Sequence, residues 1–394
     1  LRRSFIWKTK KDKKVRITFE RFLSMTDVDT AAQKITFEAL NFDGEIKVTS
    51  GLDFSEKHRM QNKNLWNCSR AEVNTENEIL MGIEGTTLHT DKKVYSSAVV
   101  DADYKNIEKI IDEKKVSVNM LIDLQVGDEK TVTKLVKNFT YKDKDNKDEF
   151  EKKIEQSDLT ELSYDDMAEE TKKWWSDVWK SSDIVIEGDE ENQQGIRFCI
   201  FQMFQTYHGA VKGTNIGAKG LTGEAYNGNA FWDTETYCLP FFLFNNKEAA
   251  KNLLYFRYKT LDEARERAKV LDCKGAFYPI ATISGKECCN LWQHASLQLQ
   301  ASTAVAYGIW FYEKMYHDEE FMKQYGLEML IEISRMLASR GDYSSDGKYG
   351  YYAVMGPDEF QMMVNNNCYT NYMGKFTLEY TLRKIKEIRE QDAA

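Results

Sequence analysis

The residues with the clearest chemical potential lie at positions 355–360, which read Met-Gly-Pro-Asp-Glu-Phe, shortly before Asn365-Asn366-Asn367. A glycosidic oxygen leaves poorly until it is protonated, so its cleavage needs a carboxylic acid that keeps a proton near neutral pH. Gly356-Pro357 fixes a turn and sets Asp358 beside Glu359. We therefore predict Glu359 as the proton donor of a carbohydrate-cleaving site.

Apolar residues surround this pair of carboxylates in the sequence. By lowering the local dielectric they are expected to favour the un-ionised acid, and they are Met355, Phe360, Met362 and Met363. A surface turn is the alternative, since Asp and Glu are common after Gly-Pro. The spacing alone leaves both interpretations open.

A second group of candidate residues is found at positions 231–235, which read Phe-Trp-Asp-Thr-Glu. The face of Trp232 suits the C–H face of a pyranose, and Asp233 can accept hydrogen bonds from sugar hydroxyls, which would fix the sugar's orientation. The same residues suit the start of a helix, with Asp233 or Thr234 as its cap. The two interpretations are compatible.

A third group spans residues 275–294 and is too polar and too rich in turn residues for a core strand. Its end, Trp292-Gln293-His294, is predicted to open a helix. Asn, Gln, His and Trp side chains together suit a polyhydroxylated acceptor. A capped helix with buried polar partners explains them equally well, so the residues alone do not decide.

The elements that must carry these groups change in type along the chain. Up to about residue 160, apolar residues alternate with polar ones, as at Ile35-Phe37-Ala39, Ile46-Val48 and Val116-Val118-Met120, which predicts an antiparallel β-sandwich. The charged segment from Lys142 to Lys153 is predicted to be a solvated loop.

Helical spacing replaces this alternation near Ser163, where Met167, Thr171, Trp174 and Val178 fall on one face. From Asn192 onward helical stripes dominate, and the three candidate groups fall in the glycine-rich connections between them. An α/α toroid has this layout, with its active-site loops at one end. Further helices are predicted near 234–245, 247–270, 297–311, 322–340 and 368–390.

Composition narrows the class of protein. The 394 residues carry a net charge of −9, which argues against a nucleic-acid binder, and no run of 18 apolar residues suggests a membrane span. Seven cysteines without a CxxC pair suggest reduced thiols of a cytoplasmic protein. The five histidines are scattered without ligand spacing, so no metal site is expected.

Taken together, the chain resembles glycoside hydrolase family 65, the disaccharide phosphorylases acting on kojibiose, nigerose, maltose and trehalose. The matching segments follow in the same order over most of the chain, which is more specific than any single motif. They are residues 1–5, 19–22, 40–42, 50–53, 186–189, 231–235, 285–288, 356–360 and 366–371.

The resemblance implies an α+β multidomain protein. Its parts are expected to be an antiparallel β-sandwich at 1–160 that lacks its first strands, a helical linker at 161–190, and the N-terminal half of an (α/α)6 barrel at 191–394. The later barrel helices, a Lys-Gln pair that contacts glucose and a Ser-rich phosphate loop are expected beyond Ala394. The chain by itself is therefore expected to be inactive.

The resemblance also assigns roles to single residues. It implies Glu359 as the general acid, and Trp232 and Asp233 as the residues that hold the glucosyl unit. The residues expected to face the acceptor sugar are Glu287, Trp292, Gln293 and His294.

The activity it implies is an inverting phosphorolysis of an α-glucosyl disaccharide to β-glucose 1-phosphate and a free sugar, with a kojibiose-type α-1,2 linkage favoured. Inorganic phosphate is the expected co-substrate, and no metal or organic cofactor is required. An inverting α-glucosidase on the same scaffold and a non-catalytic carbohydrate-binding protein remain as alternatives. Because family members are often dimeric, a homodimer is among the expectations, whereas contacts with nucleic acid or a membrane are not.

Overall fold

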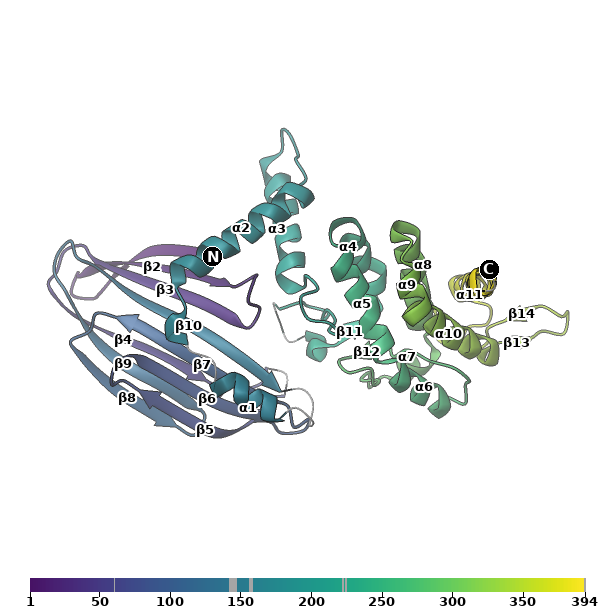
Figure 1. Ribbon diagram of the computed structural model, residues 1–394, viewed down its shortest axis with the longest axis horizontal. Helices are drawn as coiled ribbons and strands as arrows, with labels where there is room; N and C mark the ends of the chain where they lie inside the picture. The colour runs from purple at the N-terminus through teal and green to yellow at the C-terminus, as the bar shows by residue number, and fades with distance from the viewer. Residues whose placement is uncertain (60, 142–146, 156–158, 222, 224, 393–394) are drawn as a thin grey trace. The chain divides into compact units, whose positions relative to one another are not determined.

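The computed structural model describes residues 1–59, 61–141, 147–155, 159–221, 223 and 225–392. Its contacts divide the chain into two compact units, Leu1–Lys180 and Ser181–Ala394, each of which is described by itself (Figure 1). The first unit is built from antiparallel strands and the second from helices, which confirms the predicted α+β class. The division falls inside the predicted linker range 161–190.

The first unit contains two antiparallel sheets. Within the described residues, one sheet has seven strands in the order β1-β2-β3-β10-β7-β6-β5, and the other has three in the order β4-β9-β8. The strands are β1 (Arg2–Lys8), β2 (Lys14–Leu23), β3 (Thr30–Ala39), β4 (Gly44–Asp53), β5 (Trp66–Asn74), β6 (Ile79–Thr87), β7 (Lys93–Ala102), β8 (Asn106–Asp112), β9 (Lys115–Leu124) and β10 (Glu129–Tyr141).

Side chains from both sheets form one hydrophobic core. Val116, Val118 and Met120, at alternate positions of β9, are fully buried in it. Phe37 from β3 and Val48 from β4 belong to the same cluster. Full burial of an aliphatic side chain stabilises a fold by about 1.5–3 kcal/mol, so the alternation that predicted these strands also supplies much of their stability.

Helix α1 (Lys147–Glu155) corrects the sequence-based prediction of a loop from Lys142 to Lys153. Residues 142–146 lie outside the described residues, but the remainder of that segment is helical. Phe150 and Ile154, four residues apart, are buried together with Tyr95 and Phe139. The prediction was wrong because the charged residues on the outer face obscured this short apolar stripe.

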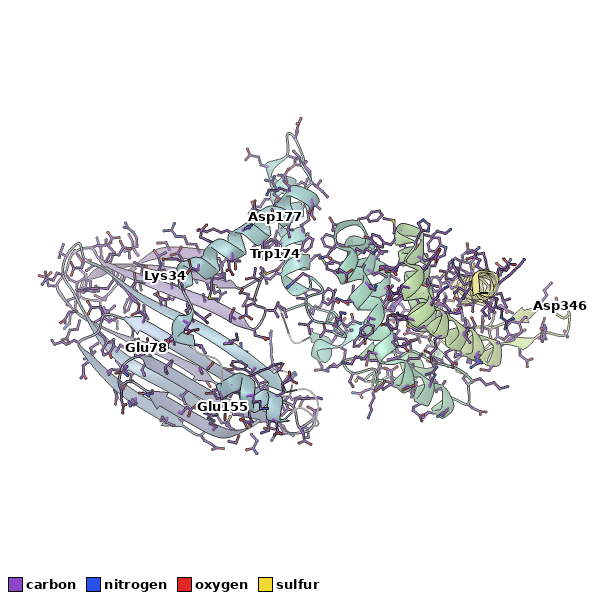
Figure 2. The ribbon with its side chains drawn as sticks, in the orientation of Figure 1. Lys34, Glu78, Glu155, Trp174, Asp177 and Asp346 are labelled. Atoms are coloured by element: carbon purple, nitrogen blue, oxygen red, sulfur yellow. The ribbon has the colours of Figure 1, made fainter. Side chains whose placement is uncertain are left out.

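Two further helical elements complete the first unit, η2 (Leu159–Glu161) and α2 (Tyr164–Ser182), whose last residues reach into the second. The face of α2 predicted to be apolar is confirmed in its first half, where Met167 and Thr171 are buried. Lys34, labelled in Figure 2, lies over the ring of Tyr164 with its Nζ 4.4 Å from the ring centroid, and so fixes the start of the helix on β3.

The second unit consists mainly of helices joined by short strands and turns. Among the described residues of either unit, no helix is both long enough and apolar enough to cross a bilayer. The elements are α3 (Glu190–Thr206), η3 (Ala225–Gly228), β11 (Ala230–Phe231), the π-helix η4 (Thr234–Cys238), α4 (Leu239–Asn245), α5 (Lys247–Lys259), α6 (Leu261–Val270), β12 (Ala281–Thr282), α7 (Trp292–Leu297), α8 (Gln300–Tyr316), α9 (Glu319–Phe321), the π-helix η5 (Met322–Gly326), α10 (Leu327–Arg340), β13 (Asp342–Tyr343), β14 (Tyr349–Gly350) and α11 (Cys368–Asp392).

The structure divides one of the predicted helices and explains where another one ends. The helix predicted at 247–270 is divided at Thr260, whose backbone (φ −107°, ψ 19°) leaves the helical region. The helix predicted at 322–340 does end at Arg340, and the φ of the Gly341 that follows is −87°, which is not left-handed. Glycine is needed there for space, because a Cβ would lie 2.5 Å from the ring of Tyr349.

The segment after α6 passes between two helices. Ala276 N donates to Glu332 O at 3.0 Å on α10, and Phe277 N donates to Ala264 O at 2.9 Å on α6. Gly275 makes this passage possible, since its φ is +72° and a Cβ would lie 2.1 Å from Glu332 O. The third candidate group therefore begins at a fixed point.

We predict that Gly275→Ala lowers the free energy of unfolding by about 2–5 kcal/mol, the sum of a left-handed backbone without glycine and an overpacked contact. Gly347→Ala is the matched control, since Gly347 has a φ of +78° and a Cβ added there would meet nothing within 4 Å. Its loss should be about 1–2 kcal/mol. Urea unfolding followed by circular dichroism measures both, and equal losses would contradict the packing explanation.

Candidate active site

A cavity of about 1000 Å³ in the second unit brings three of the candidate groups together. Trp232 and Asp233 line it from the start of η4, His294 from α7, and Glu359 from the loop before α11. The lining among the described residues does not include Glu287, Trp292 or Gln293. Four of the seven predicted site residues thus face one space.

The second and third groups meet through a short two-stranded sheet. β11 pairs with β12 in antiparallel register, with Phe231 opposite Ala281 (Figure 1). Behind this pair, Ile280 and Ala281 are buried together with Ala301 of α8, and Phe231 and Trp232 pack against them. The pairing therefore fixes residues that are about fifty positions apart in the sequence on one wall of the cavity.

The order of exposure along residues 232–235 suits a ligand-facing shelf. Trp232 is half-buried and Asp233 is exposed, whereas Thr234 and Glu235 are buried. The prediction of a helix start is confirmed, because η4 begins at Thr234, but the side chain of Asp233 makes no capping hydrogen bond. Its carboxylate therefore remains available to a ligand. The Trp232 ring is held edge-on against Tyr369, with centroids 6.1 Å apart.

A buried ion pair holds this shelf from behind. Arg257 Nε donates to Glu235 Oε1 at 2.6 Å, and its Nη2 donates to Oε2 at 2.9 Å. Both side chains are almost fully buried. Burial disfavours the guanidinium charge, but the Glu235 carboxylate outweighs that cost and raises the pKa of Arg257. Tyr278 O–H donates to Arg257 O at 3.0 Å, so the third group is tied to the same residue.

The loop that carries Glu359 is closed at its base. Val354 and Val364 exchange two backbone hydrogen bonds of 3.0 and 2.9 Å. Met355 N donates to Leu297 O at 3.0 Å, and Gln300 Nε2 donates to Gly356 O at 3.3 Å. The last residue of α7 and the first residue of α8 therefore support the loop.

The asparagine run that follows organises the same loop. Asn365 Oδ1 accepts from Ala353 N at 3.0 Å, and Asn366 N donates to Tyr351 O at 2.8 Å. Asn367 Oδ1 accepts from Thr370 N at 3.0 Å and so caps α11. This run has a structural function, which explains its position at the end of the loop that carries the candidate acid.

A polar side chain lies close to each carboxyl oxygen of Glu359. Gln298 Nε2 donates to Oε1 at 2.8 Å, and His294 Nε2 lies 3.5 Å from Oε2. The side chain is 53% exposed, that of His294 only 20%. The carboxyl is thus oriented by polar groups while it remains open to the cavity.

The predicted apolar environment of Glu359 is wrong for most of its members. Met355 is buried, but Phe360 is 99% exposed, and Met362 and Met363 are also exposed. Between Val354 and Val364 the backbone forms a loop without a regular period. The residues next to Glu359 in sequence therefore point into solvent and do not surround its carboxyl. Low dielectric from these residues does not contribute to the chemistry of Glu359.

The other residues predicted to face the acceptor sugar, Glu287, Trp292 and Gln293, have different environments in the structure. Glu287 Oε2 accepts from Ile280 N at 2.9 Å, and its Oε1 accepts from Cys289 N at 3.0 Å and Ala281 N at 3.3 Å. Its carboxylate organises the turn after β12. Trp292 is exposed and Gln293 half-buried at the start of α7. Any contact of these residues with an acceptor stays a prediction.

One thiol in the cavity wall, that of Cys238, lacks the low pKa of a nucleophile. Burial, followed by the charges of Glu235 and Asp233, raises the pKa of Cys238 to about 11. All seven cysteines are free. Among the described residues, no group of three or more His, Cys, Asp or Glu side chains is placed to hold a metal ion.

Sequence reasoning missed two residues that support the site. Arg257 follows Leu253, Leu254 and Phe256 on a buried helix, and a cation among buried apolar residues is a usable signal for an ion pair. Gln298 gave no comparable signal, since its partner Glu359 is 61 residues away.

Another cavity, of about 810 Å³, lies in the first unit between α2 and the strands β1 and β2. Its walls include Phe22, Tyr164, Trp175 and Trp179. None of the three candidate groups contributes to it. We therefore place the candidate chemistry in the helical unit.

Two family models match the chain. The glycosyl hydrolase family 65 N-terminal domain matches residues 1–178, and the glycosyl hydrolase family 65 central catalytic domain matches residues 197–394. Together they cover both units.

Curated relatives and a solved structure agree with these models. The chain is 34% identical to the maltose phosphorylase of Bacillus subtilis (strain 168), over 98% of this chain and 52% of the relative. It is 29% identical to the kojibiose phosphorylase of Thermoanaerobacter brockii, over 99% of this chain and 54% of the relative. A structure described as "Putative kojibiose phosphorylase from human microbiome" is 42% identical with a TM-score of 0.88, over 98% of this chain and 51% of that one. The chain spans about half the length of these proteins.

We predict that Arg257→Met lowers the free energy of unfolding by about 3–5 kcal/mol, because it leaves the Glu235 carboxylate buried without its partner. The double variant Arg257→Met/Glu235→Met should lose less, since neither charge remains. Arg197→Met is the matched control: its pair with Asp183 is exposed, and its loss should be about 1 kcal/mol or less. Urea unfolding measures all three, and a loss in Arg257→Met no larger than in the control would contradict the prediction.

Proposed function

The chain belongs to glycoside hydrolase family 65, and from this premise we propose that it contributes the general acid and the glucose-binding shelf of an inverting disaccharide phosphorylase. The observation that carries the proposal is that Trp232, Asp233 and Glu359 line one cavity. A sugar-stacking ring, a hydroxyl acceptor and an acid are the groups that cleavage of a glycosidic bond requires.

In this proposal, Trp232 stacks on the glucosyl unit and Asp233 accepts hydrogen bonds from its hydroxyls. The support for these roles is the exposure of the Asp233 carboxylate beside a ring that Tyr369 holds in place. Because the shelf is fixed by the buried Arg257–Glu235 pair, it orients the anomeric carbon without reorganising.

Glu359 then gives its proton to the bridging oxygen. As the bond from C1 to that oxygen breaks, its electron pair stays with the departing sugar. A phosphate oxygen forms the new bond to C1 from the opposite face, which gives β-glucose 1-phosphate. Phosphate is already an anion, so the reaction needs no second carboxylate to activate the nucleophile, unlike an inverting hydrolase.

We favour a kojibiose-type α-1,2-glucosyl disaccharide as the substrate. The support is the similarity to the kojibiose phosphorylase of Thermoanaerobacter brockii and to the solved structure at 42% identity whose title reads "Putative kojibiose phosphorylase from human microbiome". Maltose phosphorylase is similarly close, so the acceptor is the part of the proposal most open to test. A cytoplasmic location and a homodimer stay predictions.

The phosphorylase and the hydrolase differ in their need for phosphate. We predict that the complete gene product converts kojibiose to β-glucose 1-phosphate and glucose only when inorganic phosphate is present, as followed by proton NMR of the anomeric signals. A panel with nigerose, maltose, trehalose and glucosylglycerol ranks the acceptors by kcat/KM. Release of glucose at the same rate without phosphate would establish a hydrolase instead.

Removing the acid should separate catalysis from binding. We predict that Glu359→Gln lowers kcat for disaccharide phosphorolysis by about 10²–10⁴-fold, the usual contribution of a general acid, while glucose binding, measured by tryptophan fluorescence, changes little. Asp358→Asn is the matched control, because the neighbouring carboxylate accepts from Phe360 N and does not line the cavity. Glucose binding without turnover in the unmodified protein would favour a non-catalytic binding protein.

A further inference from the structure

Resting on the proposed role of Glu359 as the acid, we propose that Gln298 is a positioning residue that determines which oxygen of Glu359 carries the transferable proton. Gln298 Nε2 occupies Oε1 as a hydrogen-bond donor, so the proton resides on Oε2 and leaves from there. Nothing in the sequence pattern pointed to this residue, and the structure places it directly behind the carboxyl.

The first support is the contrast in burial between the two partners. Gln298 is 1% exposed, whereas the Glu359 side chain is 53% exposed. A buried amide has few rotamers available, so it transfers its rigidity to an otherwise mobile carboxyl. The 2.8 Å distance from Nε2 to Oε1 is that of a well-formed hydrogen bond.

The second support is the way in which the amide itself is fixed. Gln298 lies between α7 and α8 in an extended conformation (φ −92°, ψ 103°). The backbone of the preceding residue, Leu297, accepts from Met355 N at 3.0 Å, and Gln298 Nε2 also lies 3.2 Å from Met355 Sδ. Backbone and side chain therefore reach the same loop from adjacent positions, and the amide cannot move away without breaking the loop's support.

The third support is that only the donor end of the Gln298 amide has a hydrogen-bond partner among the described residues. Gln298 Oε1 is buried and has no hydrogen-bond partner among the described residues. The contact of Gln298 with Glu359 is therefore made through the Nε2 donor alone.

The assignment of the proton follows from the directions of these hydrogen bonds. An amide N–H needs a lone pair on Oε1, so the oxygen best able to carry the proton of the neutral acid is Oε2. His294 Nε2 lies 3.5 Å from that oxygen. The other titratable groups that face this cavity are Asp233, Lys219, Tyr226, Cys199, Cys238, Cys288 and Cys289.

Three variants in the complete gene product test the proposal. Gln298→Met removes the donor but keeps the shape of the side chain beside Met355. Gln298→Glu keeps the shape and replaces the donor with a second carboxyl. Gln300→Met is the matched control, because Gln300 is equally buried, also leaves its Oε1 without a partner among the described residues, and supports the loop through Gly356 O, not through Glu359.

We expect Gln298→Met to lower kcat for the disaccharide by about 10–100-fold, as a misplaced catalytic group does, with KM within about two-fold. Turnover of α-glucosyl fluoride with phosphate should be nearly unchanged, since fluoride leaves without needing a proton from Glu359. N–H donation to Oε1 favours the carboxylate form, so without it the acid keeps its proton to higher pH. The alkaline limb of the kcat profile therefore moves upward, and it moves further in Gln298→Glu, where two neighbouring carboxyls resist joint ionisation.

Gln300→Met should leave the alkaline limb in place. The positioning role is wrong if Gln298→Met and Gln300→Met both lose turnover of the fluoride together with turnover of the disaccharide. It is also wrong if the alkaline limb of the kcat profile moves in neither Gln298→Met nor Gln298→Glu. In either case Gln298 only supports the loop. If Gln298→Met unfolds, Gln298→Glu alone decides by its pH profile. Failure of the proposed function is distinct, because then Glu359→Gln itself retains disaccharide turnover.

Discussion

The buried ion pair between Arg257 and Glu235 is the interaction on which the glucose-binding shelf depends. It joins α5 to η4, and the backbone of Arg257 also accepts from Tyr278, which belongs to the segment leading to β12. Trp232 and Asp233 thus lie between Phe231, paired in β11, and Glu235, bonded to Arg257. With the backbone held at both ends, the directions of the two intervening side chains are set before any ligand arrives. A pair this deeply buried contributes geometry more surely than net stability.

The candidate acid is supported in a different way, and the difference has a chemical reason. Within the part of the chain that the structure describes, the side chains in direct polar contact with the Glu359 carboxyl are the Gln298 amide and His294, and neither is an arginine or lysine. A permanent cation beside a carboxyl favours its ionised form, which would disable a proton donor. The site therefore uses an ionic contact where it needs a fixed shape, and the neutral hydrogen bond from Gln298 where a group must change its protonation state.

The sequence predicted those features of the fold and the site that follow from local residue periodicity and residue type, and it did not predict those that depend on loops or on distant contacts. Alternation identified the strands with Val116, Val118 and Met120, and the residue types at 232–233 identified two of the residues that line the cavity. Periodicity says nothing about a loop, so the orientation of Phe360 was predicted wrongly. Contacts such as that between Gln298 and Glu359 depend on the packing of α7 against a distant loop. No pattern within either segment encodes them.

The half-exposed position of Glu359 bears on the direction of the reaction. Phosphorolysis is reversible in principle, and by microscopic reversibility the group that protonates the departing oxygen must remove a proton from the acceptor hydroxyl in the reverse reaction. A carboxyl kept neutral by a permanent apolar pocket would serve one direction and hinder the other. At Glu359 the free protein provides polar contacts and access to solvent, and the remaining desolvation can come from the sugar that covers the carboxyl when it binds. An acid whose environment is completed by its own substrate can thus act as donor with a disaccharide bound and as acceptor with glucose 1-phosphate bound.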